Sequence, residues 1–243
     1  MGKSDIVIVG NSHSFYGINA GIIGYALNRN VMNFSFEGLK YGNEVYYNNA
    51  EECLNENSSV RTMVLNIDPH AFRKWDTPTN YYDVLNMSPL KRRVKKFFAG
   101  NFSLYSDEHS VYLRDADFFI LRDNFTQFRK DNYIRSYCKG FFSDFDNARW
   151  EGFLEHVRKW HDKGITVVGI RVPMDKAATD CAMKYMTQNK LIEQFEDAGG
   201  LWVNVPGEYK TVDGSHLTGE SAFRYSEALA KELKKVTDEN PNR

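Results

Sequence analysis

Five short apolar runs, each followed by a stretch with helical spacing, constrain the fold of this chain more than any other feature. The expected strands are residues 5–9, 31–35, 60–68, 165–170 and 201–205. Runs rich in Val and Ile are typical of parallel strands that are buried on both faces. The helical stretches between them supply the crossovers that parallel strands require. The order predicts a three-layer α/β/α sandwich of the flavodoxin-like type, with a five-stranded parallel sheet.

The helical stretches are defined by apolar residues that recur three and four positions apart. They cover residues 15–27, 41–54, 150–161, 177–198 and 217–236, and each range is expected to form one helix. Two consecutive glycines, Gly199 and Gly200, end the fourth range, as is common after a helix.

Residues 70–147 interrupt this alternation of expected strands and helices. The segment is too long for an ordinary connection between a strand and a helix, and we expect a mostly helical, aromatic-rich insertion or cap after the third strand. It belongs to one domain that spans residues 1–243. A basic cluster followed by two phenylalanines, Lys91–Phe98, fits a contact with a membrane surface, and more commonly the solvated face of a helix.

Charge and composition limit the partners that this chain can have. The 243 residues carry a net charge of −1, so no overall field favours nucleic acid. No phosphate loop of the Walker type and no ligand spacing of a metal site occurs, and we expect neither a cofactor nor a metal. No apolar run approaches the roughly 18 residues of a membrane span. No secretory leader precedes the first strand, so a cytoplasmic protein and an envelope protein that has lost its leader both remain open.

The cysteines leave the redox compartment undetermined. Cys53, Cys138 and Cys181 are widely spaced and odd in number, which gives no disulfide framework. One bridge among them remains an open alternative.

Two segments at opposite ends of the chain carry the parts of a nucleophilic site. The first expected strand stops at Gly10-Asn11-Ser12, and Asp213 and His216 stand three residues apart before the last expected helix. A serine hydroxyl is a weak nucleophile and needs a base, for which His216 is the candidate, oriented by Asp213. The ends of parallel strands meet at one edge of a sheet. We therefore predict a shared site with Ser12 Oγ about 3 Å from an imidazole nitrogen of His216.

The same segments resemble the sequence blocks of the SGNH (GDSL-like) hydrolase superfamily. Gly10–Ser14 is similar to the first block and Asp213–Leu217 to the last, while Asn33–Gly38 and, more weakly, Val64–Asp68 resemble the second and third. In this chain Asn11 replaces the aspartate that precedes the nucleophile in the family, and the third block lacks its usual glycine. The resemblance does not cover the insertion.

The resemblance implies both a mechanism and a substrate class. Ser12, Asp213 and His216 would be catalytic, and the N–H groups of Ser12 and Gly38 with the Asn66 amide would form an oxyanion hole. The expected function is hydrolysis or transfer of acyl esters. Relatives that modify polysaccharides make O-acetyl groups on a carbohydrate the preferred substrate.

Each part also has a simpler interpretation. Ser12 is a residue that commonly caps helices, and Asp213 is another. His13, Asp68 and Arg171 follow expected strands and are candidates for weak substrate contacts, with a structural salt bridge as an equal alternative for Arg171. The alternative function is an SGNH-like, non-catalytic module of the cell envelope that binds a glycan or a protein.

Overall fold

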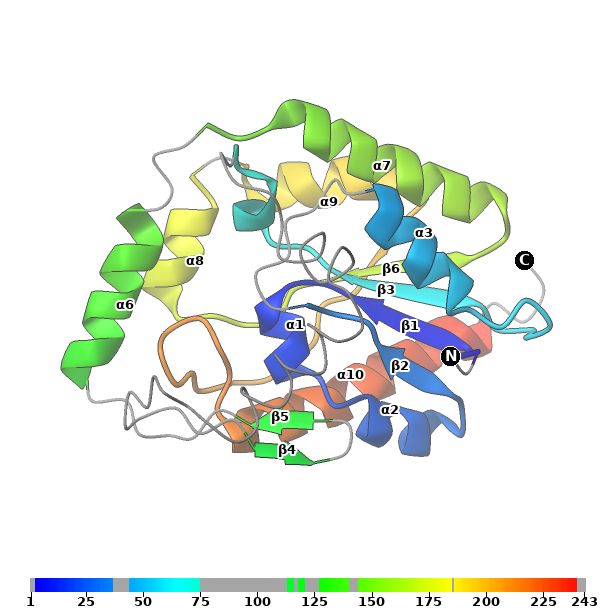
Figure 1. Ribbon diagram of the computed structural model, residues 1–243, viewed down its shortest axis with the longest axis horizontal. Helices are drawn as coiled ribbons and strands as arrows, with labels where there is room; N and C mark the ends of the chain where they lie inside the picture. Colours follow the sequence, from blue (N-terminus) through cyan, green and yellow to red (C-terminus); the bar gives the residue numbers. More distant parts are fainter. Residues whose placement is uncertain are drawn as a thin grey trace, which may run out of the picture.

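The computed structural model of this protein describes residues 3–36, 44–74, 113–115, 118–120, 127–139, 144–184 and 186–239. Its centre is a five-stranded sheet in the order β2-β1-β3-β6-β7 (Figure 1). The strands are β1 (Ile6–Val9), β2 (Val31–Asn33), β3 (Thr62–Asn66), β6 (Thr166–Ile170) and β7 (Leu201–Trp202). Every neighbouring pair is parallel. The order corresponds to the 2-1-3-4-5 arrangement of flavodoxin-like sheets, and the predicted fold class is confirmed.

Helices cover both faces of the sheet (Figure 1). One face packs against α2 (Ala20–Leu27) and α10 (Gly219–Glu239), and the opposite face against α3 (Glu44–Glu52), α7 (Asn147–Asp162) and α9 (Gln188–Asp197). Alternate residues of a strand serve the two cores: Ile8 lies in the first and Val7 in the second, and both are fully buried. This two-sided burial explains why β1, β3 and β6 read as continuous apolar runs, whereas the edge strands β2 and β7 are less buried.

The predicted helix over residues 15–27 is wrong in its continuity. The chain forms α1 (Ser12–Gly17) and α2, with Ile18 extended between them. The side chain of Asn33 donates to the carbonyl oxygens of Ser14 and Ile18, which satisfies the end of α1. Asn19 then begins α2, because its side chain accepts a hydrogen bond from Ile22 N.

The predicted helix over residues 177–198 is likewise two helices. They are α8 (Lys176–Ala182) and α9, and Thr187 caps the second by accepting from Lys190 N. A fresh capping residue inside an otherwise helical pattern divides it into two elements.

The insertion is not purely helical in its described part. It contains the short 3₁₀ helix η1 (Pro69–Phe72), the antiparallel pair β4 (Leu113–Asp115) and β5 (Phe118–Ile120), and α6 (Gln127–Lys139). The prediction of a mostly helical segment therefore missed a strand pair. Two short runs with apolar and aromatic residues, two positions apart, suit an antiparallel hairpin better than a helix. Lys91–Phe98, for which a surface contact was considered, lies outside the described residues.

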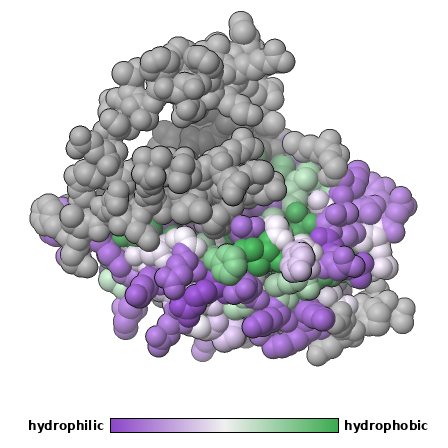
Figure 2. Space-filling view, turned by 90° about the horizontal axis from the view of Figure 1, so that it is seen from below, coloured by the Kyte–Doolittle hydropathy of each residue, from purple (hydrophilic) through white to green (hydrophobic). Residues whose placement is uncertain are grey.

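The described surface is largely polar. Among the coloured residues of the face in Figure 2, most are hydrophilic, and a group of hydrophobic residues lies between them. Among the described helices, none combines the length and the apolar character that crossing a bilayer requires.

Candidate active site

Ser12 stands at the first position of α1, at the carboxyl end of β1. Asn11 caps this helix, with its side-chain oxygen accepting from His13 N at 3.1 Å. The tight turn before it needs glycine: a Cβ atom on Gly10 would lie 2.1 Å from Ser14 Oγ. A short strand, a glycine turn and a helix cap thus hold the Ser12 hydroxyl at the edge of the sheet.

His216 reaches Ser12 from the far end of the chain. Its Nε2 lies 2.9 Å from Ser12 Oγ, although the two residues are 204 positions apart. On the other side of the ring, Nδ1 lies 2.7 Å from Asp213 Oδ2. The predicted distance between serine and imidazole is confirmed. A hydroxyl, an imidazole and a carboxylate in hydrogen-bonded sequence form the arrangement that can activate a serine.

Asp213 also shapes the loop that carries His216. Its Oδ1 accepts hydrogen bonds from the backbone N–H groups of Ser215 and His216, each at 2.8 Å. The Ser215 hydroxyl donates to the same oxygen at 3.1 Å. One carboxylate oxygen therefore folds the loop while the other orients the imidazole.

The Asp213 carboxylate is ionised in this setting. Burial alone would raise its pKa, but the hydrogen bond and charge of His216 and the backbone donors outweigh burial and lower the pKa to about 2. A carboxylate that stays charged fixes the proton of His216 on Nδ1, which leaves Nε2 free to accept a proton from Ser12.

The three expected oxyanion-hole groups have different positions. Ser12 N–H is the first amide of α1 and has no acceptor among the described residues. Gly38 lies outside the described part of the chain. Asn66 is 1% exposed, and its amide donates to Asn11 Oδ1 at 3.1 Å and accepts from Val172 N at 3.0 Å. The amide of Asn66 thus supports the turn that carries Ser12, and its role as an oxyanion donor stays a prediction.

Asp68 is buried behind the turn that carries Ser12. It is 1% exposed, and its Oδ2 accepts from Asn11 Nδ2 at 3.4 Å and lies 3.3 Å from His13 Nδ1. His13 is itself buried, and its ring lies in edge contact with that of His216, the centroids 5.2 Å apart. The structure places both residues, which were expected as weak substrate contacts, in the support of the site. That expectation stays untested as far as a bound substrate is concerned.

Arg171 is engaged mainly within the protein. Its Nη1 donates to Gln188 Oε1 at 2.9 Å, while Nη2 is buried and has no partner among the described residues. Burial lowers the pKa of this guanidinium, and the nearby Asp68 carboxylate opposes that effect. Among the described residues Arg171 forms a hydrogen bond to Gln188 and no salt bridge, so the salt-bridge alternative is not borne out and the substrate contact stays a prediction.

Helix α6 of the insertion packs over the loop of Asp213 and His216. Lys130 forms an ion pair with Asp175 at 2.8 Å, and Asp175 accepts from Thr211 Oγ1. The Tyr133 ring lies 6.3 Å from that of His216, and the Tyr137 hydroxyl donates to Asp68 Oδ2 at 3.3 Å. Sequence reasoning missed Lys130, Tyr133 and Tyr137 of α6, and with them Asp175 and Thr211, because no spacing pattern links α6 to the loop.

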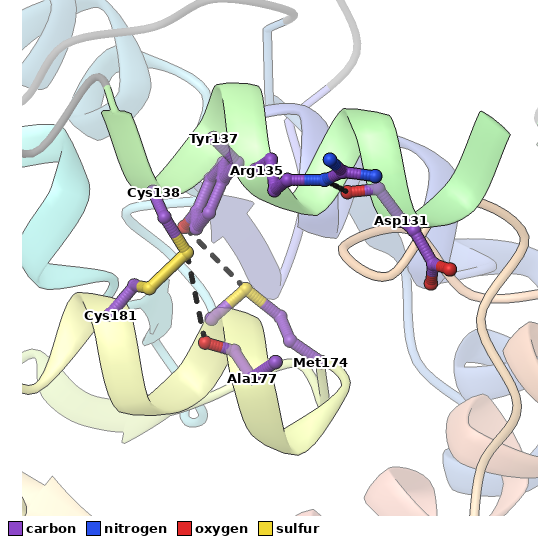
Figure 3. The surroundings of a disulfide bond; sticks show 7 residues. All are labelled: Asp131, Arg135, Tyr137, Cys138, Met174, Ala177 and Cys181. Atoms are coloured by element: carbon purple, nitrogen blue, oxygen red, sulfur yellow. Dashed lines mark hydrogen bonds between the residues drawn. A yellow bond between two sulfur atoms is a disulfide. The ribbon is translucent and has the colours of Figure 1, made fainter. Parts of the chain in front are cut away.

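A disulfide between Cys138 and Cys181 attaches α6 to α8 (Figure 3). Tyr137 lies beside the bridge, and its hydroxyl also contacts Met174 Sδ at 3.6 Å (Figure 3). The bridge that the sequence left open is therefore present, and it fixes the helix that faces the site. Cys53 is buried and free.

Two surface hollows lie away from this constellation. They have volumes of about 450 and 400 Å³ and share Ile165, the residue before β6. Ile165 precedes the amino end of a parallel strand, whereas Ser12 follows a carboxyl end. Both hollows therefore lie at the opposite edge of the sheet from Ser12.

The site offers no cluster for a cation. Within the described ranges, no group of three His, Cys, Asp or Glu side chains is arranged to hold a metal ion. In comparisons with known proteins, no family model and no curated protein matched this sequence.

Proposed function

We propose that this protein is a serine-dependent esterase or acyltransferase, related to the SGNH hydrolases, with Ser12 as nucleophile, His216 as base and Asp213 as the residue that orients it. The observation that carries the proposal is the continuous hydrogen-bonded sequence from Ser12 Oγ through His216 to Asp213, at 2.9 and 2.7 Å. The simpler interpretation of Ser12 as a helix cap is disfavoured, because Asn11 caps α1.

The reaction would proceed in two halves. Ser12 Oγ attacks the ester carbonyl carbon while His216 Nε2 takes its proton, and Asp213 stabilises the imidazolium that forms. The tetrahedral intermediate collapses when His216 returns the proton to the leaving alcohol, which leaves the acyl group on Ser12. Water or a sugar hydroxyl then attacks the acyl carbon, and His216 Nε2 takes its proton. This second intermediate collapses as the bond from the acyl carbon to Ser12 Oγ breaks and His216 returns the proton to Oγ, which releases the acid or the acylated sugar. The free N–H of Ser12 at the positive end of α1 supplies one donor to the developing oxyanion.

An acyl ester of a carbohydrate is the substrate class that we favour. Tyr133 is partly exposed and lies beside the His216 ring, which gives the site an aromatic wall of the kind that packs against sugar rings. The disulfide supports a compartment outside the reducing cytosol. Both features agree with action on a cell-surface glycan.

A fluorophosphonate probe tests the proposal, because it reacts only with an activated serine. We expect the wild-type protein to be labelled and the Ser12→Ala variant not to be. Ser59→Ala is the control: Ser59 is exposed and precedes β3, away from α1, so labelling should persist. A folded wild-type protein that is not labelled would reject the enzyme and favour the binding module.

A further inference from the structure

We propose that Asp68 is a positioning residue that holds the chain on both sides of Ser12, an inference that rests on the proposed function. Ser12 stands between Asn11 and His13 in the sequence. The side chains of both neighbours meet the same atom, Asp68 Oδ2, at 3.4 Å from Asn11 Nδ2 and 3.3 Å from His13 Nδ1. One buried oxygen atom, Asp68 Oδ2, thus contacts the residues on both sides of Ser12.

Asp68 is itself fixed to the sheet. It follows β3 by two positions, and its second oxygen, Oδ1, accepts from His70 N at 3.1 Å as the cap of η1. Asn11 is held at a second atom as well, because its Oδ1 accepts from Asn66 Nδ2 at the end of β3. The end of β3 is therefore the frame to which the turn carrying Ser12 is attached.

Only an ionised carboxylate suits the group of donors that surrounds Asp68. Asn11, His13, His70 and Tyr137 all donate to it, and an ionised carboxylate is an acceptor at both oxygens. Burial would raise the pKa of Asp68, but the hydrogen bond and charge of His13 and the charges of His70 and Arg171 outweigh burial and lower it. An amide of the same shape would place an N–H group opposite some of these donors. The hydrogen bonds that now hold Asn11 and His13 would then be lost or displaced.

The insertion takes part in the same contact. Tyr137 of α6 donates to Asp68 Oδ2, and the neighbouring Cys138 is tied to α8 by the disulfide. Asp68 therefore joins β3, α1 and α6 behind the reacting serine. Because a misplacement of about 1 Å costs about 10²-fold in rate, a small relaxation of this junction is enough to disturb the contact between Ser12 and His216.

The test compares the reactivity of Ser12 in the full chain with and without the Asp68 charge. We expect Asp68→Asn to slow fluorophosphonate labelling about 10²-fold and to lower kcat on p-nitrophenyl acetate by a similar factor, with little change in KM. The matched control is Asp146→Asn, which removes a helix-capping carboxylate of α7. It should lower stability without slowing the labelling.

A second pair of variants applies if Asp68→Asn fails to fold. His13→Gln retains an N–H donor toward Asp68 and His13→Leu does not, so labelling should be fast in the first and slow in the second. A folded Asp68→Asn protein that reacts within about threefold of wild type, or equal rates in the two His13 variants, would overturn the positioning role alone. An unlabelled wild-type protein would instead overturn the proposed function, and this inference with it.

Discussion

Ile134 of α6 occupies the space that a side chain on Gly214 would need: a Cβ atom there would lie 2.4 Å from Ile134 Cγ1. Gly214 stands between Asp213 and His216 and has a φ of 97°, a conformation that glycine adopts readily and alanine does not. The insertion and the loop of the candidate base thus pack closely at Gly214, in addition to the contact between Tyr133 and His216.

The Gly214→Ala variant should lose both stability and activity. We expect a loss of more than about 1 kcal/mol in the free energy of unfolding, measured in denaturant, because backbone strain adds to the collision with Ile134. Turnover of an ester should fall too, since the loop carries Asp213 and His216. Gly152→Ala is the control: its Cβ would meet nothing within 4 Å, so α7 should be unchanged or slightly more stable. Normal activity in Gly214→Ala would contradict the fit described here.

Replacement of the candidate base should nearly abolish catalysis. We expect His216→Ala to lower kcat on p-nitrophenyl acetate by about 10⁴-fold or more, because no other imidazole is hydrogen-bonded to Ser12 among the described residues. His161→Ala serves as the control, since that ring is exposed on α7. Turnover near the wild-type rate in His216→Ala would end the assignment of the base.

Asp213→Asn should be less damaging than His216→Ala. The amide preserves the shape of the loop but no longer stabilises the imidazolium, so we expect a loss in kcat about tenfold to a hundredfold smaller. The same assay of p-nitrophenolate release measures both variants. Equal or reversed losses would be incompatible with the roles given to the two residues.

His70 should make the fold sensitive to mild acid. Burial lowers its pKa to about 4, the Asp68 carboxylate opposes this effect, and Arg73 adds to it. Between the ordinary pKa of 6.5 and the folded value of about 4, the unfolded chain binds the proton more readily, so stability falls as pH falls. The free energy of unfolding should drop on the order of 2 kcal/mol from about pH 7 to about pH 5 through this residue.

Urea unfolding at several pH values measures this dependence. The His70→Gln variant should show a smaller fall in stability over the same range, whereas a change at the exposed His161 should leave the fall as in wild type. An unchanged slope in His70→Gln would assign the acid sensitivity to other groups.

Removal of the disulfide should loosen the insertion. The bridge joins residues 43 positions apart, and a double Cys138→Ser, Cys181→Ser variant should lose about 2–4 kcal/mol of stability. A reductant should lower the Tm of the wild-type protein toward that of the variant and leave the variant unchanged. A reductant that affects both proteins equally would implicate a different group.

The strands and the candidate site residues at the two ends of the chain could be predicted from sequence because their signals are local. Apolar runs mark each strand, and the ends of parallel strands meet at one edge, which brings Ser12 and His216 together. The break between α1 and α2 could not be predicted, since it depends on Asn33 of β2 and on Ser226 of α10, which accepts from Asn19 N at 2.9 Å. The residues near Asn19 in the sequence do not indicate these distant partners.

The contacts of α6 escaped prediction for a related reason. Lys130 pairs with Asp175, and Tyr137 donates to Asp68, although the partners are far apart in the sequence. Single polar pairs of this kind leave no periodic pattern in a sequence. The capping by Asn11 was also hidden, because serine and asparagine are both good caps and only the geometry separates them.

The long interval between Ser12 and its base has a consequence for biosynthesis. During synthesis the Ser12 hydroxyl is made 204 positions before the His216 imidazole. Under the proposed function, the Ser12 hydroxyl has no base and does not react with esters until α10 packs against the sheet and His216 reaches it. Under the proposed function, fluorophosphonate labelling during translation would therefore begin only when α10 has packed against the sheet, and the onset of labelling would report that step of folding.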